Sequence, residues 1–239
     1  MFLSVVIPAY NEEKRLADTL EKISEYLNKN KYSYEVIVVD DGSTDNTVKV
    51  ALNSSLAKQN KLVILKNNKN LGKGYSVKRG ILEARGEYII FSDADLSTPI
   101  EELDKLLFYI KNYDIVIGSR ALTSSKIIIH QPFYRELSGR FFNFFVQILV
   151  LKGIYDTQCG FKLFKANCAK KIASYLKISG FVFDVEMLYL AKKFGYNIKE
   201  VGIIWSNSTE SKVNILKNFV RIFKDLLSIK YIHKDNFQK

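Results

Sequence analysis

The sequence predicts an α/β fold in which a mostly parallel sheet is covered by helices on both faces. Short apolar runs of strand length alternate with longer segments of helical periodicity through the first half of the chain. The runs are apolar almost throughout, as is typical of strands that are buried on both faces. Acidic clusters follow two of these runs, at the carboxyl ends where such sheets bind their ligands.

Five strands are expected in the first half because each run is short, apolar and rich in β-branched residues. They are Phe2–Ala9, Tyr34–Asp40, Leu62–Lys66, Tyr88–Ser92 and Asp114–Gly118. Between the first three runs, apolar residues recur at helical spacing and predict two helices. These residues are Leu16, Leu20, Ile23 and Leu27, then Val48, Leu52 and Leu56. Gly86 marks the end of a third helix.

The second half is less regular. Residues 119–132 have no strong periodicity, which predicts a loop. The elements expected after it are a helix at Phe133–Leu151, a short strand at Phe161–Phe164, a helix at Phe183–Phe194, a strand at Ile198–Trp205 and a final helix at Val213–Ile232. Because no repeat or linker separates the halves, we expect a single domain over residues 1–239.

The net charge of +11, from 36 Lys and Arg against 25 Asp and Glu, predicts an anionic partner. Nucleic acid, an anionic membrane surface and a phosphorylated substrate all fit this charge. The aromatic residues lie in apolar runs and are not interleaved with Lys and Arg, which argues against a nucleic-acid-binding module. The apolar stretch 141–154 is interrupted by polar residues and is shorter than the roughly 20 residues of a membrane span. No membrane-spanning segment is therefore expected.

Two acidic motifs follow predicted strands. Asp40 and Asp41 close the second strand, where carboxylates accept hydrogen bonds from a base or a ribose, or cap a helix. Asp93 and Asp95 follow the fourth strand, and alternation along an extended segment puts both carboxylates on one side. Two hard oxygen ligands suit Mg²⁺ or Mn²⁺, with a substrate diphosphate completing the coordination.

Two basic motifs also follow predicted strands. The turn around Lys73 is rich in glycine and enters a helix, so its backbone can approach phosphates, although its spacing is not that of a P-loop. Arg120 ends the next strand, where its guanidinium suits a phosphate.

Five segments of the chain resemble, in order, the motifs of family 2 inverting glycosyltransferases. They are VVIPAYNEE (5–13), VVDDGSTD (38–45), NLGKGYSVKRG (70–80), DADLSTP (93–99) and GSR (118–120). Three later segments, DTQCGFKLF (156–164), FVFDVEML (181–188) and W-x5-SKV (205–213), resemble the branch that glycosylates polyprenyl phosphates, especially dolichyl-phosphate β-glucosyltransferases. The resemblance implies a GT-A fold, which is a Rossmann-like, mostly parallel sheet flanked by helices, with C-terminal helices that contact acceptor and membrane.

The resemblance also implies residue roles. Residues 1–120 would form the half that binds nucleotide-sugar and metal, and residues 121–239 the half that binds acceptor. Residues that would bind the donor are Pro8, Ala9, Tyr10, Glu12, Asp40, Asp41, Lys73, Arg79 and Asp93. Asp40 would contact the base with Asp41 supporting it, Asp93 would meet the ribose or sugar, and Asp95 would be the principal metal ligand beside Asp93. Arg120 would lie near the donor diphosphate.

Candidates for the acceptor phosphate are Arg135, Ser138, Arg140 and Lys212. In related mannosyltransferases the acceptor arginine and serine are one residue further apart than Arg135 and Ser138, so either Arg135 or Arg140 fills that role. Asp184 and Glu186 are candidates for a base or an orienting group, with a structural role as the alternative. Glu210 replaces the glycine that usually precedes SKV.

The implied reaction is the transfer of glucose from UDP-glucose to a polyprenyl or dolichyl phosphate with inversion, dependent on Mg²⁺ or Mn²⁺. The alternative enzyme is a GDP-mannose-dependent polyprenyl-phosphate mannosyltransferase, and a non-catalytic sugar-nucleotide binder is disfavoured by the intact acidic motif. Since the Q-x-x-R-W motif is absent, polymer synthesis is not expected.

The expected partners are the nucleotide-sugar, the polyprenyl phosphate and a membrane surface, with a membrane subunit as a further candidate, but not nucleic acid. The basic amphipathic segment 213–232 and the aromatic segment 141–151 would supply the membrane contact. These expectations place the protein in the cytoplasm, peripherally bound to the cytoplasmic face of a membrane.

Overall fold

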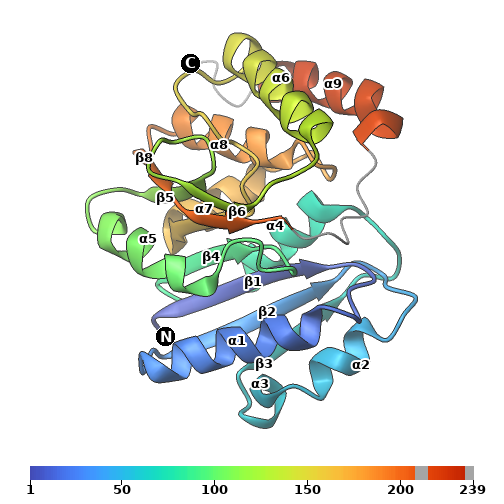
Figure 1. The fold of residues 1–239 in the computed structure, drawn as a ribbon, viewed down its shortest axis with the longest axis vertical. Helices are drawn as coiled ribbons and strands as arrows, with labels where there is room; N and C mark the ends of the chain where they lie inside the picture. Colours follow the sequence, from blue (N-terminus) through green and yellow to red (C-terminus); the bar gives the residue numbers. More distant parts are fainter. Residues whose placement is uncertain (208–214, 235–239) are drawn as a thin grey trace.

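A seven-stranded sheet runs through the centre of the molecule (Figure 1). The structure is a computed structural model that describes residues 1–207 and 215–234, without the side chains of 215–220. The strands are β1 (Leu3–Ala9), β2 (Tyr34–Asp40), β3 (Leu62–Lys66), β4 (Tyr88–Ser92), β5 (Ile115–Ser119), β7 (Phe161–Lys165) and β8 (Ile198–Gly202). They lie in the order β3-β2-β1-β4-β7-β5-β8, and β7 is antiparallel to both of its neighbours.

Helices cover both faces of this sheet, because neighbouring side chains of each strand point to opposite faces. On one face, Val5 and Ile7 of β1 share a core with α1 (Leu16–Lys29) and α5 (Leu103–Ile110). On the other face, Val6 of β1 shares a core with α4 (Lys73–Glu83), α7 (Ala166–Tyr175) and α8 (Phe183–Lys193). The short helices α2 (Thr47–Leu52) and α3 (Ser55–Lys58) pack against α1, and a 3-10 turn at Ile100–Glu102 precedes α5.

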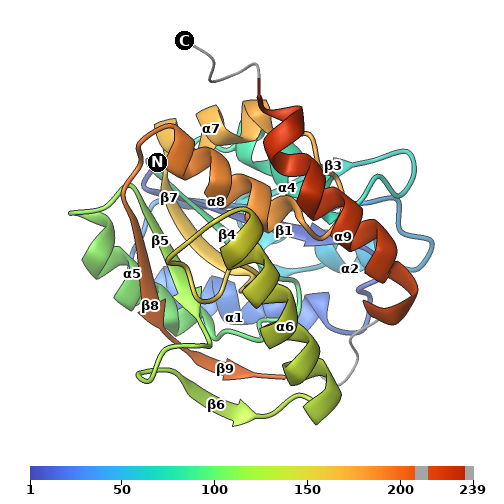
Figure 2. The same ribbon diagram turned by 90° about the horizontal axis from the view of Figure 1, so that it is seen from above.

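Two helices from the second half of the chain, α6 (Phe133–Leu149) and α9 (Ile215–Ile232), lie together beyond one edge of this core (Figure 2). The rings of Phe145 and Phe223 meet at a centroid distance of 5.2 Å and join the two helices. The two helices pack on the core through the buried side chains of Val146, Leu226 and Ile229. None of the helices in the described part of the chain is long and apolar enough to cross a membrane.

The predicted α/β architecture is confirmed, with three strands at the expected bounds and two within one residue of them. The expectation of a loop over residues 119–132 is wrong, because Lys126–Ile129 forms β6, which pairs in parallel with β9 (Ile204–Ser206). The predicted strand at Ile198–Trp205 is split into β8 and β9, since the chain leaves the main sheet after Gly202. A methyl group on Gly202 would lie 2.2 Å from Ser124 Oγ. Only glycine therefore allows the backbone at residue 202 to pass so close to the segment that contains Ser124. Helices α5 and α7 are additional to those expected.

Candidate active site

A cavity of about 590 Å³ opens at the carboxyl ends of β1, β2 and β4, the edge at which parallel sheets bind ligands. We call it the donor cavity. Its lining includes seven of the nine predicted donor residues together with Asp95. These are Pro8, Ala9, Tyr10, Glu12, Asp41, Lys73 and Asp93. Arg15, Ser76, Phe181 and three residues of α9 complete much of the wall.

Asp93 and Asp95 follow β4 and both face the donor cavity. The Lys73 ammonium lies 2.7 Å from Asp93 Oδ1, and Arg15 Nη1 lies 3.6 Å from Asp95 Oδ2. Burial alone would lower the pKa of Lys73, but the attraction of Asp93 and Asp184 outweighs it and raises that pKa. Each carboxylate of the motif thus faces a cation, which partly compensates its negative charge.

The two carboxylates fit the Mg²⁺ or Mn²⁺ ion expected from the sequence. Asp93 Oδ1 is buried and receives no well-directed hydrogen bond from the described residues, so it retains acceptor capacity beyond its ion pair. Within residues 1–207 and 215–234, no three His, Cys, Asp or Glu residues gather as a metal-binding group. The protein would therefore supply two hard oxygen ligands, and the other ligands would come from the donor diphosphate and water.

Asp41 organises the glycine-rich loop that borders the donor cavity. Its Oδ1 accepts hydrogen bonds from Asn67 Nδ2 at 2.8 Å and from the amide of Leu71 at 2.9 Å, and its Oδ2 accepts one from the amide of Gly72 at 2.9 Å. Gly72 has a φ of +101°, a left-handed conformation that glycine adopts without strain. Asp41 therefore holds the loop that carries Lys73.

Two predicted donor residues are not among the described residues that line this cavity. Asp40 is buried, and its Oδ1 accepts a hydrogen bond from the amide of Ser43 at 3.2 Å. Arg79 donates to the carbonyl of Lys66 at 2.6 Å and to Asn67 Oδ1 at 2.7 Å. Both side chains support the turns at the cavity edge.

A second cavity of about 410 Å³ lies beside α6, and we call it the arginine cavity. Arg120 reaches it from the end of β5, whereas Arg135 and Arg140 reach it from α6. Its other lining residues include Ile127, His130, Gln131, Glu136, Phe142, Asn143, Tyr155, Asp156, Gln158 and Trp205. The cavity combines cationic and apolar groups, which suits a phosphate attached to an apolar chain.

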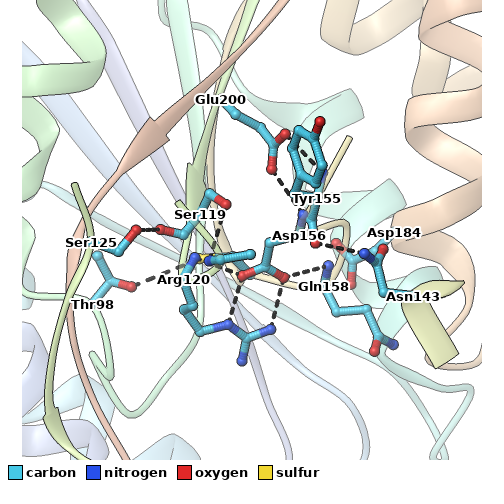
Figure 3. A network of polar contacts seen from close by, with 12 residues as sticks. Thr98, Ser119, Arg120, Ser125, Asn143, Tyr155, Asp156, Gln158, Asp184 and Glu200 are labelled. Carbon is cyan, nitrogen blue, oxygen red and sulfur yellow. Dashed lines mark hydrogen bonds and ion pairs between the residues drawn. The ribbon is translucent and has the colours of Figure 1, made fainter. Parts of the chain in front are cut away.

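Arg120 and Asp156 form a two-pronged ion pair on the wall of the arginine cavity (Figure 3). Arg120 Nε and Nη2 lie 2.7 and 2.9 Å from the two carboxylate oxygens, and the Arg120 amide donates to Oδ2 at 2.9 Å. Burial opposes the charge on both groups, yet the mutual attraction lowers the pKa of Asp156 and raises that of Arg120.

Glu200 of β8 holds the Asp156 segment in place, since its carboxylate accepts the amides of Tyr155 and Asp156, each at 2.8 Å. Arg120 is therefore held rigidly on one wall of the cavity.

Arg120 thus lines the arginine cavity together with the predicted acceptor residues Arg135 and Arg140, and the charge of Asp93 in the donor cavity also acts to raise its pKa. Its predicted place near the donor diphosphate stays a prediction. Ser138 is not among the described lining residues, and its hydroxyl donates to the carbonyl of Tyr134 at 2.6 Å. Lys212, the remaining acceptor candidate, lies outside the described residues.

Comparison with known proteins identifies the family. Residues 4–173 match the family described as Glycosyl transferase family 2. This chain belongs to that family. A dolichyl-phosphate beta-glucosyltransferase of Dictyostelium discoideum is 40% identical, covering 97% of this chain and 74% of that protein. Its counterpart in Homo sapiens is 39% identical, covering 95% and 74%, and that in Saccharomyces cerevisiae is 35% identical, covering 99% and 78%.

Solved structures share the fold of this family 2 chain. A Mycobacterium tuberculosis glucosyl-3-phosphoglycerate synthase, solved with Mn²⁺, UDP-glucose and phosphoglyceric acid, matches with a TM-score of 0.71 at 19% identity. The match covers 95% of this chain and 79% of that one. A mannosyl-3-phosphoglycerate synthase of Rubrobacter xylanophilus matches with a TM-score of 0.69 at 17% identity, covering 100% and 76%. At these identities the match shows the fold alone, and the predicted GT-A fold and glycosyltransferase class are confirmed.

Asp184 and Glu186 are not among the described residues that line the two cavities of this glycosyltransferase. Asp184 is buried in an ion pair with Lys162, and burial raises its pKa although Lys162 and Lys73 oppose this effect. Glu186 is fully buried and accepts the amides of Lys177 and Ile178, each at 2.9 Å. These contacts favour the structural alternative for both carboxylates.

Several side chains in these cavities are not assigned roles by the sequence analysis. Arg15 binds Glu12 through two hydrogen bonds of 2.6 and 2.8 Å and approaches Asp95. Asp156 is the first residue of the DTQCGFKLF segment. The family motif therefore includes this residue, but it does not predict the ion pair with Arg120. His130, given no role from sequence, lines the arginine cavity with its Nδ1 2.9 Å from Glu136 Oε1.

Proposed function

We propose that this protein transfers glucose from UDP-glucose to dolichyl or a similar polyprenyl phosphate, with inversion at the anomeric carbon. The family 2 relatives named above as dolichyl-phosphate beta-glucosyltransferases support this reaction over nearly the whole chain. The single structural observation that carries it is the arrangement of Arg120, Arg135 and Arg140 around one cavity, whose lining segment leads to Asp93 of the donor cavity. Arginine is the side chain best suited to bind a phosphate by paired hydrogen bonds.

The segment of residues 156–160 leads from the arginine cavity to Asp93, which lines the donor cavity. Asp156 and Gln158 line the arginine cavity, while the carbonyl of Gly160 accepts the amide of Asp93 at 3.1 Å. A methyl group on Gly160 would lie 2.0 Å from Asp93 Oδ2, so the backbone here passes directly beside the donor carboxylate. A phosphate held by the arginines would therefore be close to a sugar held near Asp93.

The proposed nucleophile is a phosphate oxygen of the acceptor. The second pKa of a phosphate monoester is about 6, so the acceptor is mostly a dianion at pH 7 and attacks without a general base. The enclosure of Asp184 and Glu186 agrees with this proposal, because neither lines the described cavities. Arg135 and Arg140 would orient the dianion for a single in-line displacement.

The leaving group is a nucleoside diphosphate, whose charge grows as the bond to the sugar breaks. A Mg²⁺ or Mn²⁺ ion held by Asp93 and Asp95 would stabilise that charge. Lys73, which lies on the Asp93 carboxylate, would contribute a second positive charge at the same end of the cavity. In this proposal residues 1–120 supply most of the donor site and residues 121–239 most of the acceptor site, within one domain.

The exposed face of α6 supports peripheral membrane binding. One face of the helix, with Arg135, Glu136, Gly139, Arg140 and Asn143, lines the arginine cavity. A second face, with Phe145 and Val146, packs on the core. A third face carries the apolar stripe Phe133, Leu137, Phe141, Phe144 and Ile148, each more than half exposed. This stripe would insert among lipid chains and bring the arginine cavity to the headgroups of the membrane that holds the acceptor.

The test is a donor panel. Purified protein, detergent-solubilised polyprenyl phosphate and Mg²⁺ or Mn²⁺ are incubated with radiolabelled UDP-glucose, other UDP-sugars or GDP-mannose, and the organic phase is counted. We expect label from UDP-glucose that a chelator removes. Label from GDP-mannose alone would show that the protein is the alternative enzyme, a polyprenyl-phosphate mannosyltransferase. Absence of label in the lipid phase with every donor would contradict the proposal of a lipid acceptor for this protein alone. A soluble acceptor, or a membrane subunit missing from the assay, would then be the remaining explanations.

A further inference from the structure

Helix α9 contributes one wall of the donor cavity. Arg221, Ile222 and Asp225 line the cavity together with Asp93, Asp95 and Lys73. Positions 221 and 225 are one helical turn apart and therefore share a face of the helix. The basic residues of this helix predict contact with a membrane surface. In the structure, the part with residues 221–225 lines the donor cavity.

Contacts near the C-terminal end of α9 fix its position over the cavity. Leu226 and Ile229 are fully buried in the core beside α8. His233 Nε2 lies 2.6 Å from Glu186 Oε1, and both side chains are fully buried. Lys177 Nζ donates to the carbonyl of Ile232 at 2.7 Å. The helix is thus anchored to the core, and the cavity-lining turn at 221–225 is held by the same anchor.

Arg221 differs from Lys73 and Arg15, the other described cations that line the donor cavity. Lys73 forms an ion pair with Asp93, and Arg15 forms one with Glu12. Among the residues that the structure describes, no carboxylate oxygen lies within 4.0 Å of the Arg221 guanidinium. Burial raises the pKa of Asp225, which lies on the same face of α9, and the charge of Arg221 opposes that effect. Arg221 is thus a donor-cavity cation whose charge remains available to an anion.

We propose that Arg221 is a donor-binding residue that holds the diphosphate of the nucleotide-sugar from α9. The proposal rests on the proposed function, which requires a nucleoside diphosphate in this cavity. A planar guanidinium donates two parallel hydrogen bonds to phosphate oxygens, and it does so more strongly in a partly enclosed cavity. Asp225, one turn along the helix, helps to orient the guanidinium through its negative charge.

The test compares ligands that differ in their phosphates. Calorimetry with Mg²⁺ present measures the affinity of UDP and of uridine for the parent protein and for Arg221→Gln. We expect the affinity for UDP to fall about tenfold or more and that for uridine to change by less than twofold, because a charge-assisted hydrogen bond to phosphate is lost. Arg221→Lys, which keeps the charge, is expected to recover part of the loss. Lys224→Gln, an exposed residue of the same helix, is the matched control and is expected to bind UDP as the parent does.

Equal losses for UDP and uridine, or an unchanged UDP affinity in Arg221→Gln, would overturn the role of Arg221. The same comparison with GDP and guanosine separates this proposal from the choice of donor. If the parent binds GDP in preference to UDP, the glucosyltransferase proposal fails. The role of Arg221 is then tested by comparing the affinities of Arg221→Gln for GDP and for guanosine. If the parent binds neither diphosphate, both proposals fail.

Discussion

The donor cavity and the arginine cavity have opposite balances of charge, although both are proposed to hold phosphate groups. Among the residues that the structure describes, the donor cavity is lined by the five carboxylates of Glu12, Asp41, Asp93, Asp95 and Asp225 against the three cations Arg15, Lys73 and Arg221. The arginine cavity is lined by three arginines against Glu136 and Asp156. An acidic site attracts an anionic donor together with a divalent cation, whereas a basic site holds a phosphate dianion directly. The comparison predicts that metal removal affects one site and not the other.

The largest effect is expected for Asp95→Ala. Glucose transfer should fall about a thousandfold because the charge of the leaving diphosphate is no longer stabilised. UDP affinity, measured by calorimetry with Mg²⁺ or Mn²⁺, should fall with it, and a chelator should reproduce this loss in the parent protein. Affinity for a short-chain polyprenyl phosphate should stay the same in both cases.

The matched control for Asp95→Ala is Asp18→Ala, because Asp18 is an exposed aspartate of α1 paired with Lys22. It should leave activity unchanged. If the chelator weakens acceptor binding as much as UDP binding, the contrast between the two cavities is wrong.

Gly160→Ala tests the segment that leads from the arginine cavity to Asp93. The added methyl group would lie 2.0 Å from Asp93 Oδ2, so the carboxylate or the 156–160 segment must shift. A displacement of about 1 Å near reacting groups lowers turnover about a hundredfold, and we expect a loss of that size in kcat. A variant of Gly160 with normal turnover would show that the 156–160 segment does not position the reactants.

Arg135→Gln and Arg140→Gln decide which arginine holds the acceptor. Each residue lines the arginine cavity, so loss of a charge-assisted hydrogen bond should raise the KM for polyprenyl phosphate about tenfold. The KM for UDP-glucose should not change. Ser138→Ala is expected to be neutral, because its hydroxyl bonds to the carbonyl of Tyr134 and the residue is not among those lining the cavity. A larger effect of Ser138→Ala than of either arginine would reverse this assignment.

The smallest effect is expected on membrane binding. Phe144→Ser removes one ring from the exposed stripe of α6 and should weaken partition into vesicles with anionic lipid about fivefold. Phe108→Ser is the matched control, since Phe108 is a similarly exposed phenylalanine on α5, away from the stripe. Equal losses for the two variants, measured by co-sedimentation, would mean that α6 is not the membrane-facing surface.

The sequence predicted the donor cavity better than the arginine cavity for a physical reason. Strands buried on both faces carry a long apolar signal, and parallel pairing brings Asp93 and the end of β1 to one edge. The arginine cavity depends on contacts between segments far apart in the chain. Arg120 pairs with Asp156 across 36 positions, and β6 pairs with the short strand β9 toward the far end of the chain. Periodicity within one segment contains no information on such pairs.

The position of α9 also could not be predicted from the pattern of its own sequence. Its apolar and basic residues form an amphipathic pattern that fits a membrane surface as well as a protein core. The burial of His233 against Glu186, at positions separated by 47 residues, places one turn of this helix on the donor cavity. A helical pattern alone cannot predict which partner each face meets.

The segment of residues 156–160 affects how often the proposed reactants would meet. It leads from the arginine cavity to Asp93, and Glu200 holds its first residue, so a sugar and a phosphate bound at its two ends would be kept at a distance set by the protein backbone. A phosphate confined in this way encounters the anomeric carbon as if its concentration were far above that attainable in solution, and effective molarities of about 10⁵ M are known for well-oriented groups. A lipid acceptor that is scarce in the membrane would still be glycosylated rapidly once it reached the arginines.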